Sequence, residues 1–455
     1  MDASINENAE EGSPTGFARK SAFTFAGQVV VFASNLAIGI LLARVLGTEG
    51  KGAYALIAST VALTSSIVTL GMPFAVTFYV GRHKWPPVRT FLLGSACALV
   101  PLLLLLAVMQ VVGPERVLRK AAFSPEVIQL TWLVLVLGLP LQTLGAMAGA
   151  VLRGRELIVE TVWPGMVTSI VRTALVAGLL LLVRREVISV VFADLAVGAL
   201  GTFLIGLIFY RALQGWPSAA ERPSLARLVS YGLQRQAGSI LFMLWFRGDL
   251  YFVNYFHGKS AVGLYSVSMA FAESASFPAL SVISVLLPRL ALSNAGDRLD
   301  RTLRTHRAVA VLSAATGLVL AGASALIPVV YGRSFAPAIP ATLICLGGCV
   351  LSAEIFVINS YLAAEDRQML AVAAVMVGLV CMIALDLLLI PPLGISGAAL
   401  AYAASLVVTY GVSLWLCFRF SLLRDTRTLI PRRQDLLDLV CAVRSTIGPS
   451  RRSAR

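Results

Sequence analysis

The chain has few charged residues. Asp, Glu, Lys and Arg make up 13% of its 455 residues, whereas hydrophobic residues make up 58%. A water-soluble domain carries about 25% charged and about 45–50% apolar residues, so the charges here are too few to cover a soluble surface. The apolar runs are also too long and too uniform for the alternating strands, of about 10 residues, that build a membrane β-barrel. Because a backbone in lipid must satisfy its own hydrogen bonds, these runs predict membrane-spanning helices.

The sequence also lacks the patterns that mark metal sites and enzymes. Its three histidines and six cysteines have no metal-ligand spacing, and the five cysteines in apolar segments are interpreted as small hydrophobic residues. Residues 332–337 read GRSFAP and lack the last glycine of the GxSxG nucleophile turn. No phosphate-binding loop of the Walker type is present. We therefore expect no metal, no cofactor and no catalytic residue, and we predict that the chain is not an enzyme.

Twelve apolar segments are long enough to cross the hydrocarbon layer, which takes about 20 residues of helix. The sequence thus predicts an all-α polytopic membrane protein with about 12 transmembrane helices. The first 16 residues are polar and acidic, unlike a cleavable signal peptide, so the first span is expected to stay in the membrane. The predicted spans are residues 19–43, 53–80, 90–112, 126–152, 159–183, 187–211, 225–247, 260–290, 306–331, 337–363, 369–391 and 396–420.

Basic residues set the predicted orientation. Twelve spans place both ends on one side, and if that side is cytoplasmic, the inner segments carry 25 Lys and Arg residues against 10 outside. Without the basic C-terminal tail the ratio is 16 to 10. This distribution accounts for the net charge of +14, so we expect cytoplasmic termini and no nucleic-acid partner. The predicted parts are a cytoplasmic tail (1–18), a six-helix bundle (19–211), a cytoplasmic linker (212–224), a second six-helix bundle (225–420) and a basic cytoplasmic tail (421–455).

A GxxxxGxY element occurs twice, with an offset of 211 residues, each time just after the first span of a six-span half. Both copies fall on the predicted outer side, which favours a parallel repeat whose halves are related by an axis along the membrane normal. Two like halves around a central cavity are a common scaffold for alternating access. Chance similarity is the alternative, because small residues are frequent at helix contacts. The matching residues are Gly47, Gly52 and Tyr54 in the first copy and Gly258, Gly263 and Tyr265 in the second.

Four long stretches, taken in order, carry a family resemblance. Residues 40–82 begin ILLARVLGTEGKGAYAL, and residues 247–291 begin RGDLYFVNYFHGKSAVGLYSV. They resemble the segments that open the two halves of bacterial polysaccharide repeat-unit flippases, often called the Wzx type. Residues 325–348 (ALIPVVYGRSFAPAIPATLICLGG) and 387–408 (LLLIPPLGISGAALAYAASLVV) are similar to the ninth-to-tenth helix turn and the last helical hairpin of that family. No single motif is diagnostic, but the ordered set covers most of the chain.

The resemblance implies a fold and a substrate. The fold is that of the multidrug/oligosaccharidyl-lipid/polysaccharide (MOP) exporters, in which two six-helix bundles form an inverted V around a central cavity. The implied substrate is an oligosaccharide repeat unit joined by pyrophosphate to a polyprenyl carrier, flipped across the bacterial inner membrane for lipopolysaccharide or exopolysaccharide synthesis. The implied partners are membrane lipids and, further, a polysaccharide polymerase and chain-length machinery.

Charged residues inside spans are the first candidates for a head-group contact, because a charge in the membrane is costly. Arg235 lies in the middle of the seventh span, between Gln234 and Gln236. Three adjacent side chains cannot share one helix face, so at least one is expected to face a cavity or a neighbouring helix. Arginine suits a pyrophosphate because of its forked donors, and Arg235 is the preferred phosphate contact. The alternative is an arginine that extends toward the cytoplasmic interface.

Arg172 is a second cavity candidate, in the fifth span. Asp194 lies in the sixth span at a depth that differs by roughly 6 Å, at 1.5 Å of rise per residue. The two could therefore form an ion pair across adjacent helices, which would leave Arg172 less available to a phosphate.

Three acids within spans are candidates for binding a coupled proton or sodium ion: Glu273, Glu354 and Asp194. The alternative is a neutral, hydrogen-bonded carboxyl group between helices. Asp386 is expected at the membrane interface. Because acids outnumber arginines in the spans, the sequence does not predict a cationic cavity.

Charged residues at the outer ends of spans could form an outer gate or receive the head group. The candidates are Arg44, Arg247 and Asp249. Solvated loop charges are the alternative, since exposed ion pairs usually contribute little.

Three other functions stay open. The same fold could serve a proton- or sodium-coupled antiporter of drugs or metabolites, or a flippase for a cell-wall lipid precursor. A polytopic glycan polymerase or glycosyltransferase is the enzyme alternative, and the short outer loops argue against it because such enzymes typically carry a large catalytic loop outside.

Overall fold

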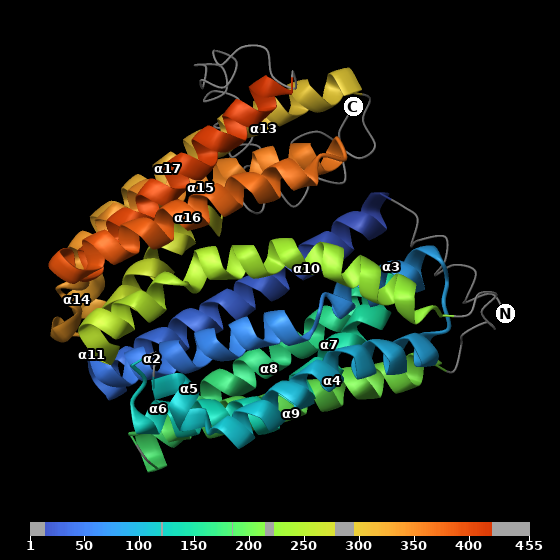
Figure 1. Cartoon of the computed structure of the whole chain (residues 1–455), viewed down its shortest axis with the longest axis horizontal. Helices are drawn as coiled ribbons and strands as arrows, with labels where there is room; N and C mark the ends of the chain where they lie inside the picture. The colour runs from blue at the N-terminus through green and yellow to red at the C-terminus, as the bar shows by residue number, and fades with distance from the viewer. Residues whose placement is uncertain (1–13, 120–121, 184, 214–222, 278–294, 421–455) are drawn as a thin grey trace, which may run out of the picture. The chain divides into compact units, whose positions relative to one another are not determined.

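The computed structural model describes residues 14–119, 122–183, 185–213, 223–277 and 295–420, which are almost entirely helical and contain no strand (Figure 1). The predicted tail 421–455, most of the linker 212–224 and residues 1–13 lie outside the described residues. The N-terminal helices are α2 (Pro14–Val68), α3 (Met72–Arg82), α4 (Pro87–Val112), α5 (Pro114–Arg119), α6 (Pro125–Leu133), α7 (Leu139–Gly154), α8 (Ile158–Gly178) and α9 (Val187–Leu213). They are followed by α10 (Leu225–Arg247), α11 (Asp249–Glu273), α13 (Ala295–Ala323), α14 (Ile327–Val330), α15 (Ala338–Ala364), α16 (Gln368–Leu393) and α17 (Ile395–Arg419).

The helices confirm the predicted all-α, multi-pass membrane fold. Among the described residues, nine helical segments are long and apolar enough to cross a membrane. The first of them, Ala26–Val68, joins two predicted spans through a break at Gly47. α10 coincides with the predicted seventh span (225–247), and α11 overlaps the predicted eighth span only over residues 260–273; neither helix is among the nine. The eighth predicted span (260–290) is described only up to residue 277. Most of the predicted N-terminal tail (1–18) lies outside the described residues, and α2 begins within it at Pro14.

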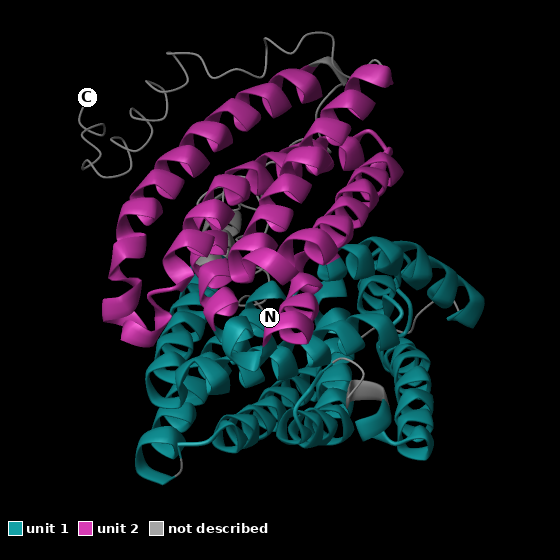
Figure 2. Cartoon of the chain, turned by 60° about the vertical axis from the view of Figure 1, so that its left-hand side comes forward, with its two compact units in different colours: residues 1–244, 258–263 teal, residues 245–257, 264–455 magenta. Residues whose placement is uncertain are grey.

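The chain forms two compact units, shown in different colours in Figure 2. Unit 1 comprises residues 1–244 and 258–263, and unit 2 comprises residues 245–257 and 264–455. Contacts thus place α10 in unit 1 up to Leu244, whereas the sequence places a boundary in the linker 212–224. The division into two bundles of six spans stays a prediction.

Each unit buries its own core. In unit 1, α2 packs on α8, α3 packs on α7, and α9 packs on both α7 and α8. Met72, Tyr79, Trp85 and Met147 are buried in its main cluster. In unit 2, α17 packs on α15 and α16, and α13 packs on α15. α15 and α17 are in close contact at Gly348, where a Cβ atom would lie 2.8 Å from the Cα of Ala403. Small residues at helix contacts are typical of membrane bundles, where packing replaces the hydrophobic effect as the driving force.

The repeated glycines have two structural uses. Gly47 and Gly258 break their helices with φ angles of 66° and 76°, in the left-handed region that favours glycine. Both elements therefore contain a break in the helix, and the same conformation at both positions supports the internal repeat. Gly52 and Gly263 instead allow backbones to touch. A Cβ at Gly52 would overlap the carbonyl oxygen of Lys259, and one at Gly263 would overlap a carbonyl oxygen of α2.

Candidate functional site

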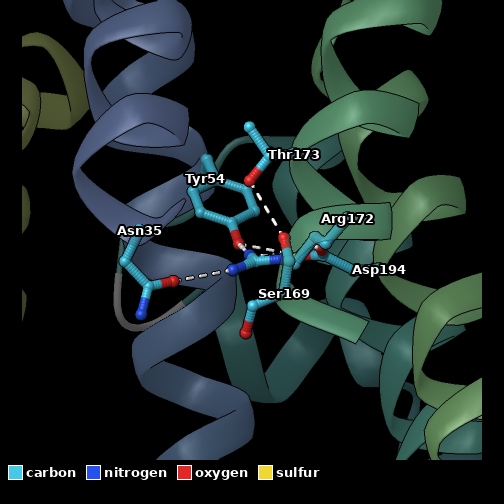
Figure 3. Close-up of polar contacts among 6 residues, drawn as sticks. All are labelled: Asn35, Tyr54, Ser169, Arg172, Thr173 and Asp194. Carbon is cyan, nitrogen blue, oxygen red and sulfur yellow. Dashed lines mark hydrogen bonds and ion pairs between the residues drawn. The ribbon is translucent and has the colours of Figure 1, made fainter. Parts of the chain in front are cut away.

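Unit 1 contains a polar network centred on Arg172 of α8 (Figure 3). The Arg172 Nε lies 2.6 Å from Asp194 Oδ1 on α9, and its Nη1 donates to Asn35 Oδ1 on α2 at 3.0 Å. The Tyr54 hydroxyl accepts from Arg172 Nη2 and donates to Asp194 Oδ2 at 2.8 Å. The predicted ion pair between Arg172 and Asp194 is therefore confirmed. It joins α2, α8 and α9.

The network uses most of the hydrogen-bonding capacity of Arg172. A guanidinium has five N–H donors, and Arg172 makes four hydrogen bonds within this network. Asp194 offsets its charge, and both side chains are about one-quarter exposed. Arg172 is thus poorly placed to bind a phosphate on its own, and Asp194 is committed to an ion pair. Their predicted roles in substrate and ion binding stay predictions.

The network forms part of the lining of a cavity of about 410 Å³, which we call the unit-1 cavity. It lies among α7, α8 and α9 and is lined on each helix by residues that share one face. On α7 these are Gly145, Gly149 and Arg153, spaced four apart, and glycines on α9 face them. Because these glycines have no side chains, space for the cavity is left between the helices. Its polar lining residues are Gln142, Arg153, Thr161, Thr168, Arg172, Asp194 and Thr202.

Arg153 gives this cavity a net positive charge. Two arginines and one aspartate line it, and the aspartate pairs with Arg172. Arg153 is exposed and forms no ion pair with any described residue. A guanidinium beside threonine hydroxyls and a glutamine amide can bind a phosphate together with polar sugar groups. Sequence reasoning missed Arg153 as a site residue because it counted it as a loop charge at the end of the fourth span. The spacing of Gly145, Gly149 and Arg153 on one helix face was the signal that could have revealed it.

The structure separates the three polar residues predicted on α10, none of which lines the unit-1 cavity. Gln236 is 4% exposed and donates from Nε2 to the Ser66 carbonyl oxygen, so it is the side chain that contacts a neighbouring helix, and its role in substrate binding stays a prediction. Gln234 and Arg235 are exposed. The Arg235 guanidinium lies 5.6 Å from the centroid of the Tyr231 ring, one helical turn earlier in the chain.

Tyr231 in turn belongs to an aromatic column in unit 1. Its ring stacks on Phe78 of α3 with centroids 4.4 Å apart, and the Arg82 guanidinium lies 6.0 Å from the Phe78 centroid. Arg235 therefore extends toward the chain's predicted cytoplasmic side, as in the alternative interpretation, and forms a cation–π contact there. Its role as a phosphate contact stays a prediction.

The predicted outer-gate residues have different environments. Arg44 is exposed on α2 in unit 1. In unit 2, Asp249 is 1% exposed and accepts hydrogen bonds from the Tyr265 hydroxyl and the backbone N–H of Leu250. Arg247 forms an ion pair with Glu273, with Nη1 and Oε1 3.1 Å apart. The alternative of solvated loop charges is therefore wrong for Asp249.

The acids predicted to bind a coupled ion are all paired. Glu273 is paired with Arg247, and Asp194 with Arg172. Glu354 is 2% exposed and contacts His306. Asp386, expected at the interface, is instead fully buried in unit 2, and neither of its carboxyl oxygens has a hydrogen-bond partner among the described residues. No group of three or more metal-binding side chains occurs in the described part of the chain.

Comparison with known proteins places these features in context. A family model described as "Polysaccharide biosynthesis protein" matches residues 17–293, which is more than half of the chain. No curated protein sequence matches the chain.

Several solved structures share the fold. The lipid II flippase MurJ, in an inward closed conformation, is similar with a TM-score of 0.67 and 16% identity over 95% of this chain and 94% of MurJ. An inward-facing multidrug resistance MATE transporter of the MOP superfamily has a TM-score of 0.65 and 15% identity, over 89% of this chain and 99% of the transporter. A MOP superfamily transporter from Pyrococcus furiosus has a TM-score of 0.60 and 14% identity, over 92% and 98%. At these identities the likeness shows the fold alone.

Proposed function

Because the chain belongs to the polysaccharide biosynthesis protein family, we propose that it flips polyprenyl-pyrophosphate-linked oligosaccharide repeat units across the bacterial inner membrane. The family match over residues 17–293 is the observation that carries this proposal. The shared fold of transporters and flippases supports alternating access as its mechanism. The proposal includes cytoplasmic termini, in keeping with the excess of basic residues in the predicted inner segments.

The unit-1 cavity is the proposed head-group site. Its volume of about 410 Å³ lies within the range of about 300–1,000 Å³ that is typical of small-ligand sites. It therefore suits a part of the head group rather than a whole repeat unit. In this proposal Arg153 binds a phosphate oxygen, while Thr161, Thr168 and Thr202 bind polar groups next to it. The polyprenyl chain stays in the lipid, and a polymerase and chain-length machinery take the product on the outer side.

We expect deletion of the gene in the source bacterium to abolish surface polysaccharide and to trap carrier-linked repeat units in the inner leaflet. The physical reason is that a polar glycan cannot cross about 30 Å of hydrocarbon unaided. Mass spectrometry of polyprenyl-linked glycans, together with surface glycan staining, measures both effects, and the wild-type gene should restore export. Normal surface glycan combined with changed resistance to drugs would contradict the proposal and favour an antiporter.

In the same complementation assay, we expect Arg153→Ala to reduce export by about tenfold or more, because a charge-assisted hydrogen bond contributes about 1.5–3 kcal/mol. Arg153→Lys keeps the charge but loses the forked donors, so it should restore export only in part. Arg89→Ala is the matched control, since Arg89 is an exposed arginine of unit 1 that does not line the cavity. Equal export by the Arg153→Ala and Arg89→Ala variants, at equal protein levels, would remove Arg153 from the site.

A further inference from the structure

Unit 2 contains a buried cluster of three polar side chains on three helices. His306 of α13 and Glu354 of α15 are 3% and 2% exposed, and the His306 Nε2 lies 2.9 Å from Glu354 Oε2. The same Nε2 lies 3.0 Å from the hydroxyl of Tyr410 on α17, and the Tyr410 and His306 rings stack with an interplanar angle of 22°. Ionisable side chains buried among membrane helices are costly and usually serve a function.

The three residues lie at a common depth and are closed off from the end of the bundle. Each is nine to eleven residues from the end of its helix, or about 14–17 Å at 1.5 Å per residue. An apolar layer lies toward that end, and beyond it Arg298 pairs with Glu365 at 3.4 Å and donates to the Ala364 carbonyl oxygen at 3.1 Å. The apolar layer is formed by Leu299, Leu303, Ile358, Leu362, Leu414 and Cys417.

The charge balance of the cluster requires one proton. With one proton shared by His306 and Glu354 the pair is neutral overall, as imidazolium with carboxylate or as imidazole with carboxylic acid. Loss of that proton would leave a buried carboxylate without a counter-charge, which costs several kcal/mol. His306 is the only charged partner of Glu354 among the described residues. The proton can therefore leave only when water reaches the cluster, and from this end of the bundle that requires the apolar layer to open.

We propose that His306, Glu354 and Tyr410 form a binding site for one exchangeable proton, and that this proton holds α13, α15 and α17 together. Three polar atoms in the cluster support exchange, because the His306 Nδ1 and both carboxyl oxygens of Glu354 have no hydrogen-bond partner among the described residues, although Oε2 lies within ion-pair distance of His306. Such atoms accept water when the helices part. Loss of the proton then favours separation of the three helices at this end of unit 2.

Other titratable groups nearby do not replace this proton. On α13, Arg307 follows His306 directly, so its side chain leaves the helix about 100° away. On α15 and α17, Tyr361 and Cys417 each lie two turns beyond Glu354 and Tyr410. The short turns Ser274–Ser276 and Ser324–Leu326, which pack on α13 and α15, carry no titratable side chain.

The native Cys417 provides the test, because it is fully buried in the apolar layer. The full chain is reconstituted in lipid nanodiscs and treated with N-ethylmaleimide, and labelling is read for each cysteine peptide by mass spectrometry. Half-buried Cys381 on α16 is the internal reference. N-ethylmaleimide reacts with the thiolate, so thiol ionisation alone changes labelling with pH in every variant. The Cys417-to-Cys381 labelling ratio of the wild type is therefore divided by the same ratio of the His306→Gln/Glu354→Gln double variant, and this quotient should rise by about threefold or more between about pH 6 and about pH 9.

A quotient that does not change with pH would overturn the proposal. Asp300→Asn is the matched control, because Asp300 is an exposed acid of α13 that pairs with Arg304, and it should behave as the wild type does. If the double variant does not fold, Tyr410→Phe carries the test. It removes only the hydroxyl that contacts His306 Nε2, and it should move the pH of half-maximal labelling. An unmoved midpoint would overturn the proposal as well.

Discussion

Gly52→Ala is expected to destabilise unit 1 by about 1–3 kcal/mol and to lower the amount of protein in the membrane, because the new methyl group has nowhere to go. A Cβ at Gly52 would overlap the carbonyl oxygen of Lys259, which is a backbone atom and cannot rotate aside. Two further contacts hold the segments together at this crossing: Ser260 Oγ donates to Thr48 Oγ1 at 2.8 Å, and the Lys259 Nζ lies 3.1 Å from Glu49 Oε2. The measurement is thermal unfolding of the purified protein in detergent.

Gly206→Ala is the matched control for this substitution. Gly206 lies within α9, and a Cβ there would meet no heavy atom within 4 Å. Alanine is favoured over glycine in a helix by about 1 kcal/mol, so this variant should be as stable as the wild type or slightly more stable. If Gly52→Ala and Gly206→Ala unfold at the same temperature, the close backbone contact at Gly52 does not contribute to stability.

Hydropathy predicted the helices because hydropathy depends only on local composition. A long apolar run in a membrane forms a helix, since its backbone must satisfy its own hydrogen bonds there. Two finer predictions also succeeded for local reasons. Gly47 and Gly258 were identified by their repeat, and each requires a positive φ that most other residues avoid. Arg172 and Asp194 were paired by their similar depth in adjacent spans, and an unpaired charge at that depth would be costly.

The remaining site residues depend on contacts that a single sequence does not contain. Arg153 was assigned to a loop, and its place in the unit-1 cavity arises only when α7, α8 and α9 pack together. His306 is the first residue of the predicted ninth span (306–331), yet side chains of α15 and α17 contact it and it is buried. Gln236 and Asp249, in contrast, were proposed as site residues and are buried in contacts within the protein. Their burial depends on partners far along the chain or across a helix break, at Ser66 and Tyr265.

Substitutions at the Arg172–Asp194 pair are expected to have the second large effect. Arg172→Ala leaves the Asp194 carboxylate without its counter-charge, and Asp194→Ala leaves the guanidinium in the same state. Removing one partner of an ion pair costs more than removing both, so each single variant should lose about 1–3 kcal/mol of unfolding free energy. The loss of unfolding free energy stays within that range because both side chains are about one-quarter exposed, so that solvent screens the charge that remains.

The Arg172→Ala/Asp194→Ala double variant then separates a structural role from a substrate role. A favourable coupling between the two side chains should make the double variant more stable than the sum of the single losses predicts, and thermal unfolding of all four proteins measures this coupling. Because the network already uses four of the five donors of Arg172, we expect export to recover together with stability in the double variant. If stability recovers and export does not, one of the two side chains contacts the substrate directly. The head-group site would then extend along the cavity from Arg153 to the Arg172–Asp194 pair.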